Sequence, residues 1–274
     1  MSIPQEKIAA LKKKASEIRR DIITMLACSK SGHPGGSLSS VEIMTSLYFS
    51  VMRHDPSMQD PFRDRFHLSK GHGCPVWYAV LADCGYFDKS HFCQLRKLGG
   101  LLQGHPSIDI PGVECSSGSL GQGLSVATGM ALAGRLDAKQ GRVYCVMGDD
   151  ELQEGGIWEA AMSAAHYKLD NLCGIVDHNG LQIDGKVADV MNVSPIDKKF
   201  EAFGWHAISV DGHDVAQLLE AFEKAKLVKG RPSVIVAHTV KGKGVSFMEH
   251  NVNFHGVTPN ADETAKALAE IGAA

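Results

Sequence analysis

The chain has 274 residues, of which 44% are hydrophobic and 22% are charged, and its formal net charge is −3 at pH 7. These values are ordinary for a globular protein with a large core. The small net charge and the lack of a long like-charged block argue against nucleic acid as a partner. No apolar run approaches the roughly 20 residues of a membrane span, and the N-terminus is not signal-like, so we expect a cytoplasmic protein without a membrane partner.

Cysteine usage also argues against a structural zinc site. The seven cysteines are an odd number and include no C-x-x-C pair. Cys145 and Cys173 lie inside apolar runs, and we expect both to be buried free thiols in a reducing compartment.

The N-terminal third predicts two helices, a short strand and a third helix. Apolar residues at three- and four-residue steps give the first helix one buried face, made of Ile8, Leu11, Ala15, Ile18, Ile22 and Leu26. A glycine- and proline-rich break over 29–40 precedes a second helix over 41–52. A short strand is predicted within 63–73, where it ends in a Gly-His-Gly turn, and a helix follows over 75–86.

The remaining two thirds alternate between strands and helices. A Gly- and Ser-rich loop over 116–123 opens a helix that ends near Leu136. Further helices are predicted over 156–169, 215–228 and 264–271, and strands over 141–149, 171–179, 203–212 and 231–240. This alternation predicts an α/β fold with a doubly wound, mainly parallel sheet and helices on both faces. No linker or repeat interrupts it, so we expect one domain over 1–274.

In such sheets ligands bind at the carboxyl ends of the strands, which directs attention to the loops after Leu68, Met147, Val176 and Ala237. Asp149 and Asp150 end one predicted strand, and Asp177, His178 and Asn179 end the next. A right-handed strand–helix–strand unit brings these ends together, so Asp149, Asn179 and the Leu181 carbonyl can share a hard cation that also binds phosphate. Alternatively, the two aspartates only cap the helix near Gly156, and Asn179-Gly180 is only a turn.

Two further features favour a ligand site. The glycine-rich segment Gly118–Gly123 precedes a helix, so its free backbone N–H groups can approach a phosphate. His33, His72 and His105 each stand beside Gly or Pro, in "SGHPGG", "KGHG" and "QGHPS". Glycine neighbours allow a backbone loop to approach a ligand closely.

The sequence resembles the N-terminal, diphosphate-binding part of transketolase over nearly its whole length. The matching motifs occur in order and are "SGHPGG", "LSKGHG", "GHPS", "GSLGQG", "GDDELQEGGIWEAA", "HYKLDNL", "HNGLQIDG", "FGWH", "DGHD" and "HGVTPN". The family's cofactor fingerprint is Gly-Asp-Gly followed about thirty residues later by Asn, and here Asp149 precedes Asn179 by 30 positions.

The resemblance implies a thiamine diphosphate cofactor held through Mg²⁺, with Ca²⁺ or Mn²⁺ as alternatives. It assigns the metal to Asp149, Asn179 and the carbonyl of Leu181. The positions implied around the cofactor are His72, Gly118, Ser119, Leu120, Gly148, Asp149, Asp150, Glu154, Asn179, Lys241 and His255, with Lys70 close by. Glu154 also matches a subunit-interface residue. The histidines implied in catalysis, which line the cofactor and the sugar, are His33, His72, His105 and His255.

Two departures from the family pattern matter. Position 150 is Asp where the fingerprint has Gly, which would allow positive φ and close approach to the diphosphate. The added charge could weaken binding, or the side chain could point to solvent; we expect binding to be retained. The second departure is that the pyrimidine-binding and third domains of full-length transketolases find no counterpart in this sequence.

The resemblance therefore implies the N-terminal subunit of a split transketolase. Such an enzyme transfers a two-carbon ketol unit between sugar phosphates, and we expect an α2β2 complex with a C-terminal, pyrimidine-binding subunit. Two alternatives remain: a subunit that decarboxylates or dehydrogenates a 2-oxo acid, and a non-catalytic scaffold. A set of proton-shuttling histidines suits polyhydroxylated substrates better than 2-oxo acids.

Overall fold

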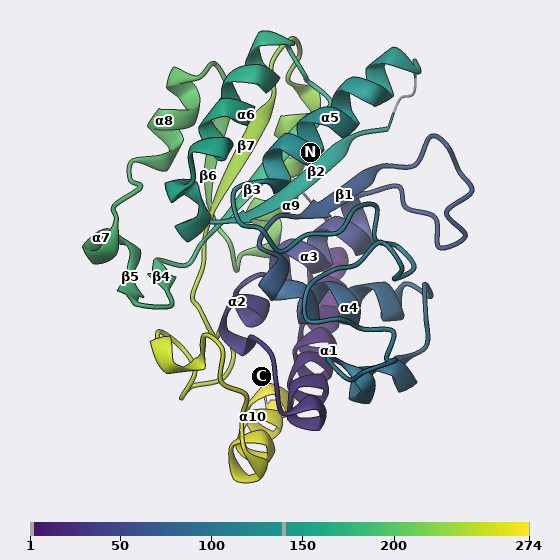
Figure 1. The fold of residues 1–274 in the computed structure, drawn as a ribbon, viewed down its shortest axis with the longest axis vertical. Coiled ribbons are helices and arrows are strands. Elements are labelled where there is room, and N and C mark those ends of the chain that lie inside the picture. Colours follow the sequence, from purple (N-terminus) through teal and green to yellow (C-terminus); the bar gives the residue numbers. More distant parts are fainter. Residues whose placement is uncertain (1–2, 139–140, 274) are drawn as a thin grey trace.

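The structure, a computed structural model that describes residues 3–138 and 141–273, is built on a five-stranded parallel sheet with strand order β1-β2-β3-β7-β6 (Figure 1). Its strands are β1 (Arg65–Leu68), β2 (Val143–Gly148), β3 (Leu172–His178), β6 (His206–Asp211) and β7 (Ser233–His238). A small antiparallel pair joins β4 (Leu181–Gln182) to β5 (Gly185–Lys186). The sheet confirms the parallel α/β fold predicted from the sequence.

Helices cover both faces of this sheet, and further helices lie below it in the view of Figure 1. The α-helices are α1 (Gln5–Ser29), α2 (Pro34–Ser39), α3 (Val41–Ser46), α4 (Cys74–Asp83), α5 (Gly123–Leu136), α6 (Gly155–His166), α7 (Val187–Val190), α8 (Ile196–Ala202), α9 (Val215–Leu227) and α10 (Ala261–Ala273). The short 3-10 and π segments are η1 (Leu47–Val51), η2 (Gly71–Gly73), η3 (Lys89–Gln94), η4 (Asp150–Gln153) and η5 (Val252–Phe254).

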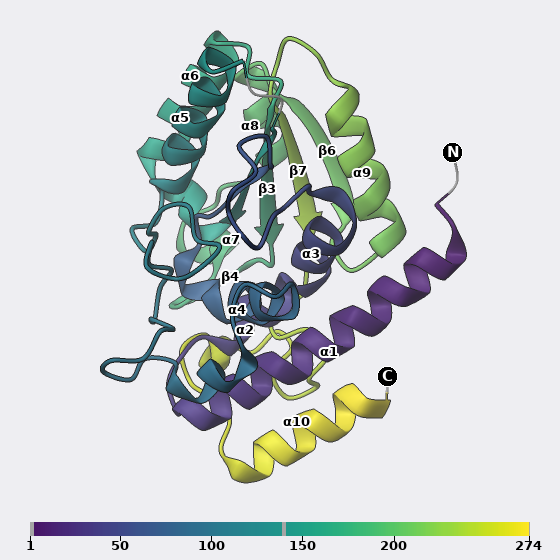
Figure 2. The same cartoon turned by 90° about the vertical axis from the view of Figure 1, so that its right-hand side faces the viewer.

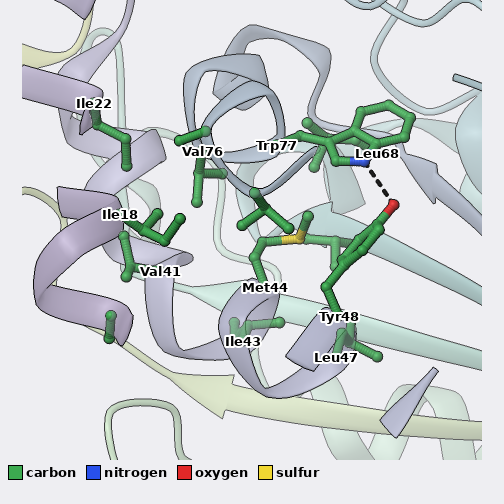
Figure 3. Packing of buried hydrophobic residues seen from close by; sticks show 14 of the residues in the cluster. Ile18, Ile22, Val41, Ile43, Met44, Leu47, Tyr48, Leu68, Val76 and Trp77 are labelled. Carbon is green, nitrogen blue, oxygen red and sulfur yellow. Dashed lines mark hydrogen bonds between the residues drawn. The ribbon is translucent and has the colours of Figure 1, made fainter. Parts of the chain in front are cut away.

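The period of two along each strand divides the apolar residues between two cores. Tyr144 and Val146 of β2 face the core shared with α1, α3, α4 and α9, whereas Cys145 and Met147 face the core shared with α5, α6 and α8. Figure 2 shows these two helical layers on either side of the sheet, with α10 lying along α1. Within the first core, the indole N–H of Trp77 donates to the Tyr48 hydroxyl at 2.7 Å (Figure 3).

The first helix is confirmed, and all six residues of its predicted apolar face are buried. The predicted break in helical structure at 29–40 is only partly confirmed. Lys30 ends α1 in a left-handed conformation (φ 53°), but Pro34 then starts the short helix α2, because proline suits the first turn of a helix. The second predicted helix, over 41–52, consists of α3 followed by the π turn η1.

Cys145 and Cys173 are buried free thiols, as expected. Cys28 and Cys93, for which no sequence pattern indicated pairing, form a disulfide between the end of α1 and η3. Across the described ranges no helix is both long and apolar enough to span a bilayer.

Parallel pairing brings the ends of β2, β3 and β7 to one edge of the sheet. Gly148 is in register with Asp177, and His178 is in register with His238. The loops that follow β1, β2, β3 and β7 therefore meet where the sequence predicts the ligand site.

Candidate active site at the carboxyl edge of the sheet

Asp149 lies directly after β2 and is fully buried. Its Oδ2 atom accepts a hydrogen bond from the Gly180 backbone N–H at 2.8 Å, but its Oδ1 atom has no hydrogen-bond partner within the described part of the chain. Burial, aided by the nearby Asp150 and Asp177 carboxylates, raises the pKa of Asp149 to about 7. A buried carboxylate oxygen left unpaired in this way is costly unless a ligand satisfies it. The Oδ1 atom of Asp149 can therefore coordinate a cation.

The other two predicted metal ligands lie beside it. The Asn179 side-chain oxygen accepts a hydrogen bond from the Leu181 N–H at 3.1 Å, which makes the turn that the alternative interpretation expected. The Leu181 carbonyl accepts a hydrogen bond from Lys241 Nζ at 2.8 Å. Lys241 is also buried, and burial lowers its pKa to about 8. The lysine ammonium thus already supplies positive charge to an oxygen of the predicted metal site.

Neither aspartate caps α6, so the capping alternative is wrong. The N-cap residue of α6 is Glu154, which makes no side-chain capping bond. Asp150 instead begins η4, a right-handed segment, so this position does not use the left-handed backbone that glycine would permit. Its side chain does not simply point to solvent either: Asp150 lines a cavity, and its pKa is raised by burial against the opposing effect of Lys241 and Lys70.

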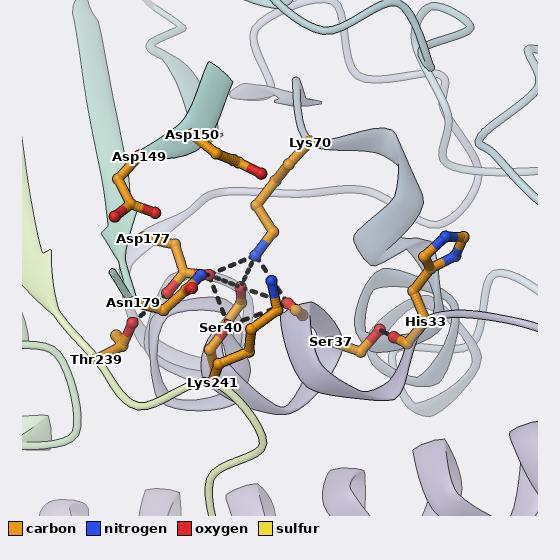
Figure 4. Close-up of polar contacts among 12 residues, drawn as sticks. His33, Ser37, Ser40, Lys70, Asp149, Asp150, Asp177, Asn179, Thr239 and Lys241 are labelled. Carbon is orange, nitrogen blue, oxygen red and sulfur yellow. Dashed lines mark hydrogen bonds and ion pairs between the residues drawn. The ribbon is translucent and has the colours of Figure 1, made fainter. Parts of the chain in front are cut away.

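Asp177, which the sequence placed at a strand end but to which it assigned no role, is the hub of the polar network (Figure 4). Lys70 donates to its Oδ2 atom and also to the Gly36 carbonyl at 2.7 Å. Ser39 donates to the same carboxylate at 2.6 Å, and Thr239 donates to its other oxygen. Burial raises the pKa of Asp177, but these partners, above all Lys70, outweigh it and hold that pKa at about 2. The signal was present, since Asp177 ends the strand that precedes Asn179, but its partners come from segments far apart in sequence.

The four predicted histidines form one cluster although they come from four separate loops. The ring centroids of His33 and His72 are 5.4 Å apart, and those of His33 and His105 are 6.4 Å apart. His255 lies 5.3 Å from His72, with its ring stacked, and 5.5 Å from His33. Lys241 Nζ donates to His255 Nδ1 at 2.8 Å, which places the proton of a neutral His255 on Nε2.

All four rings are neutral at pH 7. Burial, followed by Arg96 and His105, lowers the pKa of His33 to about 4, and burial together with Lys241 lowers that of His255 to about 3. Burial first and Lys70 second hold the pKa of His72 well below its ordinary value, and burial with Arg96 lowers that of His105. Each ring can therefore donate one hydrogen bond and accept another.

The glycine-rich loop packs directly on the histidines. Gly118 has a φ of +151°, and a Cβ atom there would lie 3.3 Å from the His105 ring. Gly121 has a φ of +85°, and a Cβ atom there would lie 2.4 Å from the Glu154 side chain. The predicted loop thus closes one wall of a cavity of about 330 Å³, whose lining residues include His72, His105, Gly118, Leu120, Asp150, Glu154 and His255.

These observations fit a divalent cation with a phosphate-bearing ligand. One orphaned carboxylate oxygen, one amide and one carbonyl make few protein ligands, which suits Mg²⁺ completed by phosphate oxygens. No cage of three His, Cys, Asp or Glu side chains occurs in the described residues. The backbone N–H groups of the glycine loop and the Lys241 ammonium lie at the same edge to meet negative charge.

Comparison with known proteins agrees with this arrangement. Residues 11–274 match the family described as "Transketolase, thiamine diphosphate binding domain". The chain is 42% identical over 264 residues to one of the subunits of apulose-4-phosphate transketolase from Actinobacillus succinogenes, covering 95% of each chain. It is 41% identical over 263 residues to a 6-deoxy-6-sulfo-D-fructose transketolase subunit from Clostridium sp., covering 95% of this chain and 96% of that one. It also superposes on transketolase from Leishmania mexicana with a TM-score of 0.90 and 33% identity, covering 96% of this chain but 41% of that one.

The fold and site define an α/β enzyme chain whose ligands bind at the carboxyl edge of a parallel sheet. The chain belongs to the transketolase family and corresponds to its N-terminal, thiamine-diphosphate-binding part.

Proposed function

We propose that this chain is the N-terminal subunit of a split transketolase. The complex transfers a two-carbon ketol unit from a ketose phosphate to an aldose phosphate, with thiamine diphosphate and Mg²⁺, and it is cytoplasmic. The chain is active only with a C-terminal, pyrimidine-binding subunit, in an α2β2 complex. Ca²⁺ or Mn²⁺ can replace Mg²⁺, because the proposed ligands are oxygen atoms.

The observation that carries this proposal is the cluster of four histidines at the same edge of the sheet as Asp149, whose Oδ1 atom has no hydrogen-bond partner among the described residues. Two relatives of nearly the same length are named as subunits of apulose-4-phosphate transketolase, which supports a two-chain enzyme. The transketolase of Leishmania mexicana is a longer chain, of which this chain covers 41%.

Asp149, Asn179 and the Leu181 carbonyl would hold the cation, and Gly118, Ser119 and Leu120 would face the diphosphate. When bound, the thiazolium ring of the cofactor supplies the stabilisation of an acyl carbanion equivalent. The chain's own residues bind, orient and move protons. Lys241 adds a buried positive charge beside the proposed metal site.

His33 and His105 are proposed to face the reacting carbon and the hydroxyls of the sugar, and His72 and His255 to lie on the cofactor side. A neutral imidazole can donate its N–H to an oxygen that gains negative charge and can accept a proton on its other nitrogen. Glu154 is exposed at the start of α6 and is proposed to meet the partner subunit.

The proposal is tested with the complex of this chain and a candidate C-terminal subunit, expressed together and loaded with thiamine diphosphate and Mg²⁺. Ketol transfer is measured with a panel of ketose phosphate donors, and decarboxylation is measured with a panel of 2-oxo acids. Transfer between sugar phosphates supports the proposal. Turnover of 2-oxo acids alone, or a loaded complex without either activity, would contradict it.

A further inference from the structure

Arg96 lies between the two loops that carry His33 and His105. Its backbone has a φ of 60°, and its amide N–H donates to the Leu102 carbonyl at 2.9 Å, which fixes where the side chain starts. Its Nη1 atom donates to Ser31 Oγ at 2.9 Å. Ser31 stands two residues before His33. Arg96 belongs to the chain segment that leads to His105, so its guanidinium connects the two histidine loops.

The second loop meets the same guanidinium at Gly104, the residue before His105. A Cβ atom on Gly104 would lie 2.4 Å from Arg96 Nε and 3.0 Å from its Cζ, so the planar group rests against the bare glycine backbone. The neighbouring backbone is also fixed by α4: Cys74 Sγ donates to the Gly104 carbonyl at 3.3 Å, and the Tyr78 hydroxyl donates to the Gln103 carbonyl at 2.9 Å. The glycine therefore makes room for Arg96 rather than for a turn.

The positive charge of Arg96 acts on two of the four rings. The positive charge of Arg96, after burial, lowers the pKa of both His33 and His105. After burial, Lys70 and Lys241 lower the pKa values of His72 and His255, and Lys241 also acts on His33. Other charged or titratable groups line the cavity, and these are Asp150, Glu151 and Glu154.

We propose that Arg96 is a positioning residue that ties the His33 loop to the His105 loop and places a positive charge beside these two rings. The idea rests on the proposed function in one respect, namely that the pair faces the sugar. A hydrogen bond to Ser31 and a contact with Gly104 fix the two loops from the outside.

Four single variants separate the tether from the charge. Arg96→Met removes both. Arg96→Lys keeps the charge, but one ammonium cannot both reach Ser31 and lie flat along Gly104. Gly104→Ala leaves Arg96 intact and forces its guanidinium away. Lys97→Met removes the neighbouring exposed cation and is the matched control.

The first measurement is a histidine-ring NMR titration of the full chain, which does not require enzymatic activity. In Arg96→Met the pKa values of His33 and His105 should rise while those of His72 and His255 stay unchanged, and Lys97→Met should change none. Unchanged pKa values for His33 and His105, or an equal change in all four rings, would overturn the proposal.

The second measurement is ketol transfer by the complex, with the cofactor saturated. Arg96→Met, Arg96→Lys and Gly104→Ala should each lower kcat by roughly 10- to 100-fold, the scale of a small misplacement of catalytic groups, with an unchanged Kd for the cofactor. The acid limb of the kcat profile should move to higher pH in Arg96→Met and much less in Arg96→Lys. Wild-type kcat in Gly104→Ala and Arg96→Lys would refute the tether. Absence of ketol transfer in the wild-type complex would count against the proposed function, whereas the NMR titration still decides whether Arg96 controls the pair.

Discussion

Asp149 is the residue on which the proposed cofactor site depends most. Replacing it by Ala removes the buried carboxylate, so we expect thiamine diphosphate with Mg²⁺ to bind more than about 100-fold more weakly, beyond the range typical of residues that only support metal ligands. The free energy of unfolding should not fall, because burial already raises the pKa of this carboxyl group to about 7 and one oxygen is unpaired. Calorimetric titration and urea unfolding measure the two quantities. Wild-type cofactor affinity in Asp149→Ala would remove it from the ligand set.

Unlike Asp149, Asp150 is not expected to be needed for cofactor affinity. It adds a half-buried negative charge next to the proposed diphosphate site, and its η4 backbone is one that any residue can adopt. Asp150→Gly and Asp150→Asn should therefore both bind the cofactor as well as or better than the wild type. If only Asp150→Gly improved affinity, backbone freedom rather than charge would be the cause. Weaker binding by Asp150→Asn would mean that the carboxylate itself contributes to the site.

We expect His33 and His105 to affect the rate of ketol transfer more than the binding of the sugar phosphate. Changing either to Asn should lower kcat by about 10²- to 10⁴-fold, the usual scale for a general acid or base. An interaction made mainly in the transition state lowers kcat and kcat/KM together. His72→Asn serves as the contrast, since we expect it to weaken cofactor retention as well. Near-wild-type kcat in both His33→Asn and His105→Asn would leave these histidines as supports for their loops.

At the scale of elements, Glu42 joins three segments that are far apart in sequence. It pairs with Arg19 of α1 at 2.5 Å and accepts a hydrogen bond from His213 Nδ1, in the turn before α9, at 2.9 Å. The Val240 N–H donates to His213 Nε2 at 2.8 Å, so the His213 proton lies on Nδ1. Although burial opposes it, the Arg19 charge and the His213 bond lower the pKa of Glu42 below 4.5.

Glu42→Ala should cost roughly 3–5 kcal/mol of unfolding free energy at pH 7, because it leaves the Arg19 charge buried without its partner. The lowered pKa means that the folded state favours the carboxylate. Its contribution is therefore full above the unfolded value of 4.5 and is lost as pH falls below it. Urea unfolding from pH 7 to pH 3 should show the difference from wild type shrinking. Glu223→Ala, at an exposed pair with Lys226, should change stability by about 1 kcal/mol or less. A constant Glu42→Ala difference at all pH values would argue that lost packing, not charge, is responsible.

Hydrophobic periodicity predicted the main elements of this fold because burial dominates in long helices and central strands. The six apolar residues of α1 and the alternating residues of β2 are examples. It did not predict α2, since that short helix is held by tertiary contacts such as Gly36 with Lys70. For the site, motif order indicated the histidines and Asp149. The roles of Asp177 and Arg96 were not predicted, because their partners, among them Thr239 and Ser31, are adjacent only in three dimensions.

At the scale of the whole molecule, the layer formed by α5 and α6 exposes apolar side chains on the side away from the sheet. Leu136 is 86% exposed, Met162 is 59% exposed and Tyr167 is 50% exposed. Single exposed apolar residues are common, but several in one layer, whose helix α6 begins directly after Glu154, suit a surface that a second subunit covers. We take this layer as the expected contact with the C-terminal subunit.

The last prediction follows from that contact. Co-expression with the C-terminal subunit should give an α2β2 species by native mass measurement, and the isolated chain should show no ketol transfer. Met162→Glu places a charge in the expected interface, so it should abolish assembly without changing the unfolding midpoint. Leu227→Glu, at a residue 79% exposed at the end of α9 in the opposite layer, should assemble normally. Turnover of sugar phosphates by the isolated chain would remove the need for a partner, and assembly of Met162→Glu with wild-type affinity would place the interface elsewhere.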